Sequence, residues 1–165
     1  MRDTTGVAPS GVGDASQLRV AVVASSYYET ITDALVDGAV SALQDQGASG
    51  DQVVIIRVPG AFELPFAASQ AAQTGRFDAV VCLGCVIRGE TPHFDYISSA
   101  VAHGITTASQ STGVPMSFGV LTTNTYDEAV ARAGAGADNK GREAALAAVQ
   151  LTHVVRQLSH STSDA

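Results

Sequence analysis

The sequence predicts a three-layer αβα sandwich in which helices cover both faces of a four-stranded parallel sheet. Four short apolar runs are rich in β-branched residues, and each is followed by a stretch with the apolar spacing of a helix. The first three helical stretches close on a glycine, namely Gly47, Gly75 and Gly113. Strands that alternate with helices pair in parallel through right-handed crossovers, which place helices on both faces of the sheet.

The first half of the chain contains two such units. Residues 18–25 predict a strand, and the helix after it is marked by apolar residues at intervals of four: Ile31, Leu35, Ala39 and Leu43. Residues 53–58 predict the second strand, and residues 64–74 predict the helix that follows it. Both strands are nearly continuous apolar runs, as expected for strands that are covered on both faces.

The second half completes the sheet. Residues 79–87 and 116–121 predict two further strands, and residues 94–112 and 126–132 predict the helices after them. A last helix is expected at residues 139–158, with one apolar stripe: Ala144, Ala148, Leu151, Val155 and Leu158. The result is an open, flavodoxin-like sheet. In such sheets ligands bind outside the carboxyl ends of the strands, which selects the loops at residues 25–28, 59–63, 88–93 and 122–125.

Length and composition fit one domain. We expect the domain at residues 18–158, a flexible arm rich in Gly, Ser, Thr and Ala at residues 1–17, and a polar tail at residues 159–165. Hydrophobic residues make up 45% and charged residues 15%, so much of the chain should lie in a core or between subunits. The net charge of −7 argues against broad contact with nucleic acid or an anionic membrane. No stretch resembles a signal peptide or a membrane span, so a cytoplasmic location is expected.

Cys82 and Cys85 have the Cys-x-x-Cys spacing of zinc and redox motifs. They lie within the third predicted strand, where side chains three positions apart point to opposite faces. We therefore expect two separate buried thiols, with neither a shared metal nor a disulfide. Elsewhere no set of His, Cys and carboxylate residues has the spacing of metal ligands, so neither a metal nor a cofactor is expected.

The loop at residues 88–93 joins a strand to a helix and has the features of an anion site. Thr91 suits the N-cap and Pro92 the first helical position, which leaves loop amides free to bind an anion, and Gly89 allows close approach of the backbone. The alternative is an ordinary capped helix start without a ligand. Residues 84–91 also approach the phosphate-binding P-loop, but Glu90 stands where that motif requires Lys, which argues against a nucleoside triphosphatase.

One histidine and several aromatic residues lie near these loops. His93 is the one histidine within the four loops, and its place beside the expected anion site suits a proton shuttle. Aromatic side chains in or next to the loops suggest a stacking surface for a planar ring: Tyr27, Tyr28, Phe62 and Phe118. The two phenylalanines suit the core equally well.

Two cations flank a glycine-rich hinge at residues 133–138. Arg132 precedes the hinge and Lys140 follows it, and both are candidates to neutralise a phosphate. For Lys140 a solvated helix start is the alternative interpretation. A phosphate ligand needs such locally placed cations because the chain as a whole is acidic.

Residues 58–63, 118–123, 139–141 and the run Arg88-Gly89-Glu90-Thr91-Pro92-His93-Phe94 have the residues, order and spacing of one known family. Over residues 18–158 the chain resembles the 6,7-dimethyl-8-ribityllumazine synthases. The resemblance implies that 5-amino-6-(D-ribitylamino)uracil is joined to 3,4-dihydroxy-2-butanone 4-phosphate, with release of phosphate and water and without metal or cofactor, in the penultimate step of riboflavin synthesis. The substrate amine is its own nucleophile, so the protein mainly aligns two molecules and moves protons.

The resemblance also implies roles for individual residues. Tyr27 stacks on the pyrimidine ring, His93 moves protons, and Arg132 is the charge partner of the phosphate, with Lys140 as a further candidate. The other implied residues hold the ring substituents and ribityl chain (Ala61, Phe62, Glu63), line the ring pocket (Cys85, Val86, Ile87, Phe118) or bind the phosphorylated butanone through loop amides (Glu90, Thr91).

Four positions depart from the commoner family pattern. Tyr27 stands where Phe or Trp is usual, and Tyr28 replaces a frequent Asn. Cys85 occupies a small-residue position, and Asp138 adds an acid that could weaken the pull of Lys140 on phosphate. Two other classes stay open: a non-enzymatic flavin or nucleotide carrier, and a shell or scaffold protein whose site has decayed. A histidine beside an anion loop favours the enzyme.

The resemblance implies a homo-oligomer, either a pentamer or a sixty-subunit shell of twelve pentamers, with riboflavin synthase as a candidate partner. Phe118 and Arg132 are then expected across a subunit boundary from the loops that carry Tyr27 and His93. The hinge has the short length of shell-forming relatives and favours the shell. Pro9 and the glycines of the arm argue against it, because they could prevent the arm from adding an edge strand to a neighbour.

Overall fold

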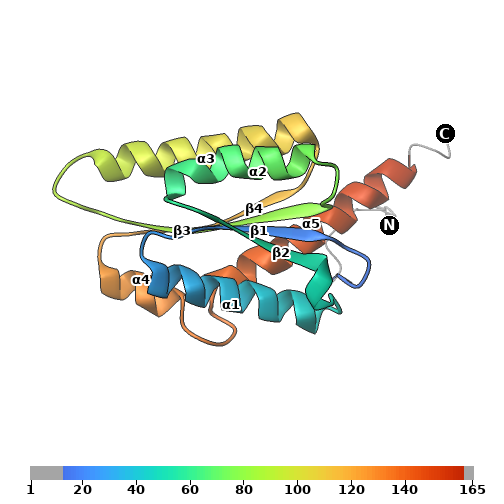
Figure 1. The fold of residues 1–165 in the computed structure, drawn as a ribbon, viewed down its shortest axis with the longest axis horizontal. Coiled ribbons are helices and arrows are strands. Elements are labelled where there is room, and N and C mark those ends of the chain that lie inside the picture. The colour runs from blue at the N-terminus through green and yellow to red at the C-terminus, as the bar shows by residue number, and fades with distance from the viewer. Residues whose placement is uncertain (1–12, 162–165) are drawn as a thin grey trace, which may run out of the picture.

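The computed structural model describes residues 13–161, which form an all-parallel sheet with the strand order β2-β1-β3-β4 (Figure 1). The strands are β1 (Val20–Ser25), β2 (Val53–Val58), β3 (Ala79–Ile87) and β4 (Met116–Thr123). The helices are α1 (Glu29–Asp45), α2 (Leu64–Gln73), α3 (His93–Thr112), α4 (Tyr126–Arg132) and α5 (Lys140–Ser161), and the short 3-10 helices are η1 (Gly50–Gln52) and η2 (Ala61–Glu63). The predicted fold class is confirmed.

A layer of helices covers each face of the sheet. Helices α2 and α3 lie on one face, and α1, α4 and α5 lie on the other (Figure 1). Two apolar clusters fill the space between these layers and the sheet. Val22 and Val81 belong to the cluster of α1 and α5, whereas their neighbours Val23 and Val80 belong to the cluster of α2 and α3. This alternation follows from strand geometry, because successive side chains point to opposite faces.

The register of the strands brings their carboxyl ends to one end of the sheet. Ser25 of β1 lies beside Val58 of β2, and Ile87 of β3 lies beside Thr123 of β4. The alignment continues into the loops, since the Arg88 N–H donates to the Thr123 carbonyl oxygen at 2.9 Å. The loops that follow the four strands therefore start at the same end of the molecule.

Helices α1 and α5 touch through their backbones. A Cβ atom on Gly141 would lie 2.0 Å from the Leu35 carbonyl oxygen. The Asn139 side chain is buried, and its amide donates to the carbonyl oxygens of Ala34 and Ala133, both at 3.1 Å. Its amide oxygen accepts a backbone N–H from the first turn of α5 at 3.0 Å, as an N-cap does. Asn139 thus ties the hinge at residues 133–138 to α1.

Two local expectations need correction. Pro92, not Thr91, occupies the N-cap of α3, which begins at His93 and has no side-chain cap. The apolar stripe expected on the last helix is buried at Ala144 and Ala148, but its later members are exposed: Leu151, Val155 and Leu158. Leu151 is exposed although Val149 and Thr152 beside it on α5 are buried, so it lies on another face of the helix. The carboxyl-terminal end of α5, which carries Val155 and Leu158, extends beyond the sheet (Figure 1).

The ends of the domain extend past the expected boundaries. Residues 13–17, expected in the arm, pack on the domain: Ala15 is fully buried and its N–H donates to the Gln46 carbonyl oxygen at 2.8 Å. Helix α5 continues to Ser161, so the first residues of the expected tail are helical. The rest of the expected arm, residues 1–12, and of the expected tail, residues 162–165, lies outside the described residues.

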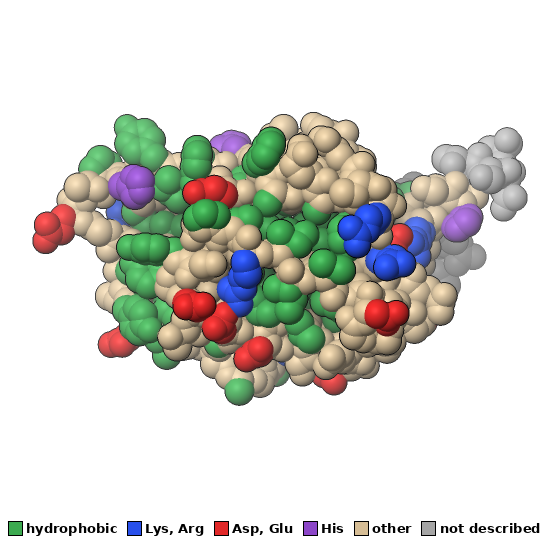
Figure 2. Space-filling model, in the orientation of Figure 1, with side chains coloured by type: hydrophobic (Ala, Val, Ile, Leu, Met, Phe, Trp, Pro, Cys, Tyr) green, Lys and Arg blue, Asp and Glu red, His purple; other side chains and the backbone are tan. Residues whose placement is uncertain are grey.

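Much apolar surface lies on the outside of the single chain. Figure 2 shows hydrophobic side chains gathered between the two helical layers on the face seen there. Among the described residues, four Phe and Tyr side chains are more than half exposed: Tyr27, Phe62, Phe66 and Tyr96. Apolar surface of this extent is typical of a face that binds a ligand or another protein chain. Among the described helices, none combines the length and apolarity needed to cross a membrane.

Cys82 and Cys85 lie on opposite faces of β3, as predicted. Cys82 belongs to the apolar cluster of α2 and α3, Cys85 belongs to that of α1 and α5, and both are free thiols. Burial raises the pKa of Cys82 to about 12 and the pKa of Cys85 to about 11. Both side chains are therefore protonated at neutral pH and are poor nucleophiles.

Replacing Gly141 by Ala should destabilise the protein, although Gly→Ala within a helix usually stabilises it by up to about 1 kcal/mol. The added Cβ would overlap the Leu35 carbonyl oxygen and push α5 away from α1. We expect a loss of about 1–3 kcal/mol in the free energy of unfolding, measured by urea denaturation. Gly50→Ala is the control, because a Cβ there meets no atom within 4 Å. Equal stability of the two variants would contradict the close contact.

Neither cysteine should react with iodoacetamide in the native protein at pH 8. The raised pKa values leave almost no thiolate, and burial blocks access of the reagent. Mass spectrometry should detect no label in native protein and two labels per chain after unfolding in guanidinium chloride. Rapid native labelling of Cys85 would show that its strand end opens to solvent.

Candidate active site

Two cavities hold most of the residues to which the sequence pointed. The loop cavity, about 530 Å³, is formed by the loops after β1, β2 and β3 and by the first turns of α3. The β4 cavity, about 310 Å³, lies between β4, the end of α4 and the first turns of α5. The two cavities share no lining residue.

The loop cavity brings together nine of the predicted site residues: Tyr27, Ala61, Phe62, Glu63, Cys85, Val86, Ile87, Thr91 and His93. Three others line the β4 cavity instead: Phe118, Arg132 and Lys140. Glu90 lines neither cavity, and its side chain is exposed. A single chain therefore does not assemble all the predicted residues in one place.

Tyr27 and Tyr28 form an aromatic wall of the loop cavity. Their rings meet edge to face with centroids 4.7 Å apart, and the Tyr126 ring lies 6.2 Å from that of Tyr28. Tyr27 is 66% exposed, so its ring is accessible to a planar ligand. Burial raises the pKa of Tyr28, which therefore stays a neutral phenol at pH 7.

The backbone of Tyr28 is unusual. Within residues 13–161 it is the one non-glycine residue with positive φ, at φ 57° and ψ 55°. Asn tolerates this left-handed conformation better than Tyr does. The conformation turns the chain from β1 into α1, because Tyr28 occupies the N-cap of that helix. A strained residue of this kind beside a cavity is typical of functional sites.

The loop between β3 and α3 offers free backbone donors. Within the described chain, the N–H groups of Gly89, Glu90 and Thr91 donate no hydrogen bond. Gly89 and Thr91 line the loop cavity, and the amino terminus of α3 follows immediately. Free amides next to a helix start attract an anion without requiring net positive charge. This loop therefore suits a phosphate or another small anion.

His93 is the first residue of α3 and lines the loop cavity. Its side chain is exposed, and its imidazole forms neither a hydrogen bond nor an ion pair with any described residue. An imidazole with both nitrogens free can hydrogen-bond to a bound ligand and move a proton to or from it. His93 and the loop for which the sequence predicts an anion site thus line the same cavity.

Arg88 was not among the predicted site residues, yet it makes the main side-chain contacts at this loop. Its Nε donates to the Asn124 Oδ1 at 3.0 Å, and its guanidinium lies 3.5 Å from the Asp95 Oδ1. The guanidinium carbon also lies 4.4 Å from the centre of the Phe94 ring. Asn124 is 36 residues away in the chain, so spacing alone gives no signal for this contact.

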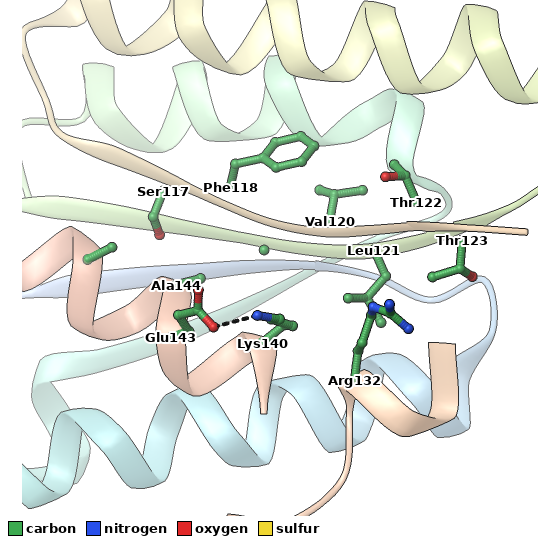
Figure 3. Close-up of a pocket in the computed structure, with 12 residues that line it drawn as sticks. Ser117, Phe118, Val120, Leu121, Thr122, Thr123, Arg132, Lys140, Glu143 and Ala144 are labelled. Carbon is green, nitrogen blue, oxygen red and sulfur yellow. Dashed lines mark hydrogen bonds and ion pairs between the residues drawn. The ribbon is translucent and has the colours of Figure 1, made fainter. Parts of the chain in front are cut away.

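The β4 cavity carries the cations. In Figure 3, Phe118 projects from β4 toward the layer of α2 and α3, whereas Arg132 and Lys140 lie on the side of α4 and α5. The Lys140 Nζ forms an ion pair with the Glu143 Oε2 at 2.7 Å. Arg132 donates to the Glu128 carbonyl oxygen at 2.9 Å and forms no ion pair within residues 13–161. Arg132 is therefore the more available cation for a ligand.

Some lining residues were missed by the sequence reasoning. Phe94 and Ile97 lie one helical turn apart on α3, and both line the loop cavity. Their spacing of three residues places them on one face of the helix, so the sequence contained a signal for this pair. Glu143 lines the β4 cavity one turn after Lys140 and is its partner, whereas the expectation had pointed to Asp138. In the described part of the chain, no group of three or more His, Cys, Asp or Glu side chains is arranged to hold a metal ion.

The chain is similar over most of its length to proteins of known family. A family model described as 6,7-dimethyl-8-ribityllumazine synthase matches residues 17–156. A protein of that name from Syntrophus aciditrophicus (strain SB) is 48% identical over 144 residues, which cover 87% of this chain and 94% of the relative. One from Salinibacter ruber (strain DSM 13855 / M31) is 49% identical over 140 residues, covering 85% and 90% respectively. The chain therefore belongs to the 6,7-dimethyl-8-ribityllumazine synthase family.

Proposed function

We propose that this chain forms 6,7-dimethyl-8-ribityllumazine from 5-amino-6-(D-ribitylamino)uracil and 3,4-dihydroxy-2-butanone 4-phosphate, and that the reaction takes place in the loop cavity. The observation that carries the proposal is that three loops distant in the sequence bring an aromatic wall, free amides and a free histidine into one cavity. Family membership identifies the chemistry that such a cavity performs. The product serves riboflavin synthesis.

The pyrimidine ring occupies the apolar part of the loop cavity. The exposed face of Tyr27 stacks on the ring, and the carboxyl end of β3 at Cys85, Val86 and Ile87 lines the rest of the ring pocket. Ala61, Phe62 and Glu63 belong to η2, which borders the same cavity, and they bind the ring substituents and the ribityl chain. The cavity volume of about 530 Å³ lies in the usual range for small-molecule sites.

The phosphorylated butanone binds at the loop between β3 and α3. The free backbone N–H groups of Gly89, Glu90 and Thr91 donate hydrogen bonds to the phosphate oxygens. Glu90 therefore contributes its backbone and not its side chain. His93 lies at the end of this loop and lines the same cavity. It moves protons during imine formation, loss of phosphate and ring closure.

The site is completed by a neighbouring subunit. Phe118 and Arg132 suit the ring and the phosphate, but they line the β4 cavity of the same chain and not the loop cavity. We propose that the β4 cavity of one subunit faces the loop cavity of the next in a pentamer or in a shell of pentamers. The exposed apolar side chains near the loops support such a contact: Tyr27, Phe62, Phe66, Tyr96 and Tyr126. Lys140 attracts the phosphate less strongly than Arg132 does, because Glu143 already neutralises its charge.

The direct test is to incubate the purified protein with both substrates and to follow the absorbance of the lumazine product. Product formation that depends on both substrates and on protein concentration supports the proposal. Omitting either substrate is the control. A protein that binds the pyrimidine or a flavin but forms no lumazine with both substrates present would favour a carrier and would contradict the enzyme.

His93→Ala should lower kcat by up to about a hundredfold, the lower end of the range for general acid–base catalysis, because water and buffer can replace part of the proton transfer. The KM of the pyrimidine should change little, since His93 acts on the reacting atoms. His103→Ala is the matched control, as His103 is an exposed residue of the same helix that lines neither cavity. Unchanged turnover of His93→Ala across the pH range removes His93 from the mechanism.

Mixing two impaired variants should raise the activity above that of either one if the site is shared. His93→Ala and Arg132→Ala each damage one half of every site, and refolding them together in equal amounts should give up to about a quarter of intact sites. The measurement is the specific activity of the mixture against that of each variant refolded alone. Light scattering on the same samples reports the pentamer or larger shell. A mixture no more active than its components places both residues in one subunit's site.

A further inference from the structure

The loop at residues 89–92 has conflicting requirements. Its amides must stay free to bind the phosphorylated substrate, and within the described chain they form no internal hydrogen bond. A loop without such bonds samples many conformations, and ordering it on binding weakens affinity. Contacts outside its own backbone must therefore hold its shape before the ligand arrives.

We propose that Arg88 is the positioning residue that holds this loop and that Asn124 orients Arg88. The inference rests on the proposed function, because it assumes that the loop binds the phosphorylated substrate. Neither residue lines the loop cavity, so both act through the loop and not on the substrate.

The contacts of Arg88 connect the two ends of the loop. Arg88 itself precedes the loop, while Phe94 and Asp95, its partners in the stacking contact and the ion pair, lie in the first turn of α3 after it. The Arg88 backbone is fixed as well, since its N–H donates to the Thr123 carbonyl oxygen at 2.9 Å. One side chain therefore connects the two ends of the loop across its base.

Asn124 provides the fixed point for this side chain. Its Oδ1 accepts the Arg88 Nε at 3.0 Å, and its own backbone N–H donates to the Glu128 Oε2 of α4 at 2.8 Å. The Arg88 side chain is 47% exposed and that of Asp95 is 63% exposed, so water and salt weaken the ion pair and it adds little to global stability. These contacts act on the loop by fixing the position of the Arg88 side chain, more than by adding stability to the fold.

A guanidinium group suits this role better than an ammonium group. Its nitrogens lie in one plane and can donate to Asn124 and Asp95 together, while its central carbon lies over the Phe94 ring. A lysine would keep the positive charge and lose the fixed direction of these donors. Replacing Arg88 by Lys therefore distinguishes an effect of positioning the loop from an effect of positive charge alone.

The experiment compares Arg88→Met, Arg88→Lys and Asn124→Ala in the full-length protein. If Arg88 positions the loop, Arg88→Met should raise the KM of the butanone phosphate about tenfold, equivalent to about 1.4 kcal/mol, and the KM of the pyrimidine less than threefold. Arg88→Lys should keep most of this defect. Asn124→Ala, which changes no charge, should raise the same KM about threefold, and the Arg88→Met/Asn124→Ala double variant should be no worse than Arg88→Met.

Arg156→Met is the matched control, because Arg156 has a comparable ion pair with Asp78 at 2.9 Å, has a side chain 44% exposed and lines neither cavity. Its KM values should equal those of the wild type, and Tm should differ little among all the variants. Full recovery in Arg88→Lys with no effect of Asn124→Ala would mean that Arg88 attracts phosphate by charge alone, which overturns the proposal. Equal increases in both KM values with a lower Tm would overturn it as well.

Inorganic phosphate, titrated calorimetrically into each protein, separates this inference from the proposed function. If the wild type forms no lumazine but binds phosphate more tightly than Arg88→Met and Asn124→Ala, the proposed reaction fails and the role of Arg88 at the anion loop stands. If the wild type is active and all variants bind phosphate and turn over alike, the reaction stands and the positioning role fails.

Discussion

The parallel pairing of β3 with β1 on one side and β4 on the other determines where the functional groups of this chain lie. Residues 79–85 of β3 are buried and contribute to the apolar clusters on both faces of the sheet. Packing here is tight enough that a Cβ on Gly84 would lie 3.0 Å from the Ser25 Oγ and 3.1 Å from Leu64. Because all four strands run the same way, burial of this one strand places the loops around it at one end of the sheet.

That arrangement explains how an acidic protein can bind a phosphorylated substrate. The net charge is −7, so long-range attraction does not favour an anion. Free amides at the start of α3 supply partial positive charge at short range, where the dielectric screening of water is weakest. The cost is a loop without internal hydrogen bonds, and the contacts of Arg88 with Asn124 and Asp95 offset that cost.

The separation of the two cavities within one chain relates the proposed site to the assembly of subunits. Phe118, Arg132 and Lys140 line the cavity beside β4, which is an edge strand of the sheet in the described chain. The loops with Tyr27 and His93 line the other cavity. A proposed site that needs both sets links catalysis to subunit contact, because a monomer leaves each half open to water. The exposed apolar residues in the second half of α5, such as Leu151 and Leu158, are further surface available for contact.

The sequence by itself determined the strands, the helices and the candidate residues of the loop cavity. Apolar strand segments that alternate with helical spacing, and glycines that end helices, are local features of the sequence. Gly47, Gly75 and Gly113 could therefore be identified as helix ends, and all three have positive φ. Only the tertiary structure decided the N-cap of α3, the left-handed Tyr28, the Lys140–Glu143 ion pair and the contact of Arg88 with Asn124. The first two features depend on the path of the backbone through the loops, and the Lys140–Glu143 pair depends on which nearby acid the Lys140 side chain reaches. The contact of Arg88 with Asn124 joins residues 36 positions apart, and the physical reason it could not be predicted is that such contacts leave no periodic signal in the sequence.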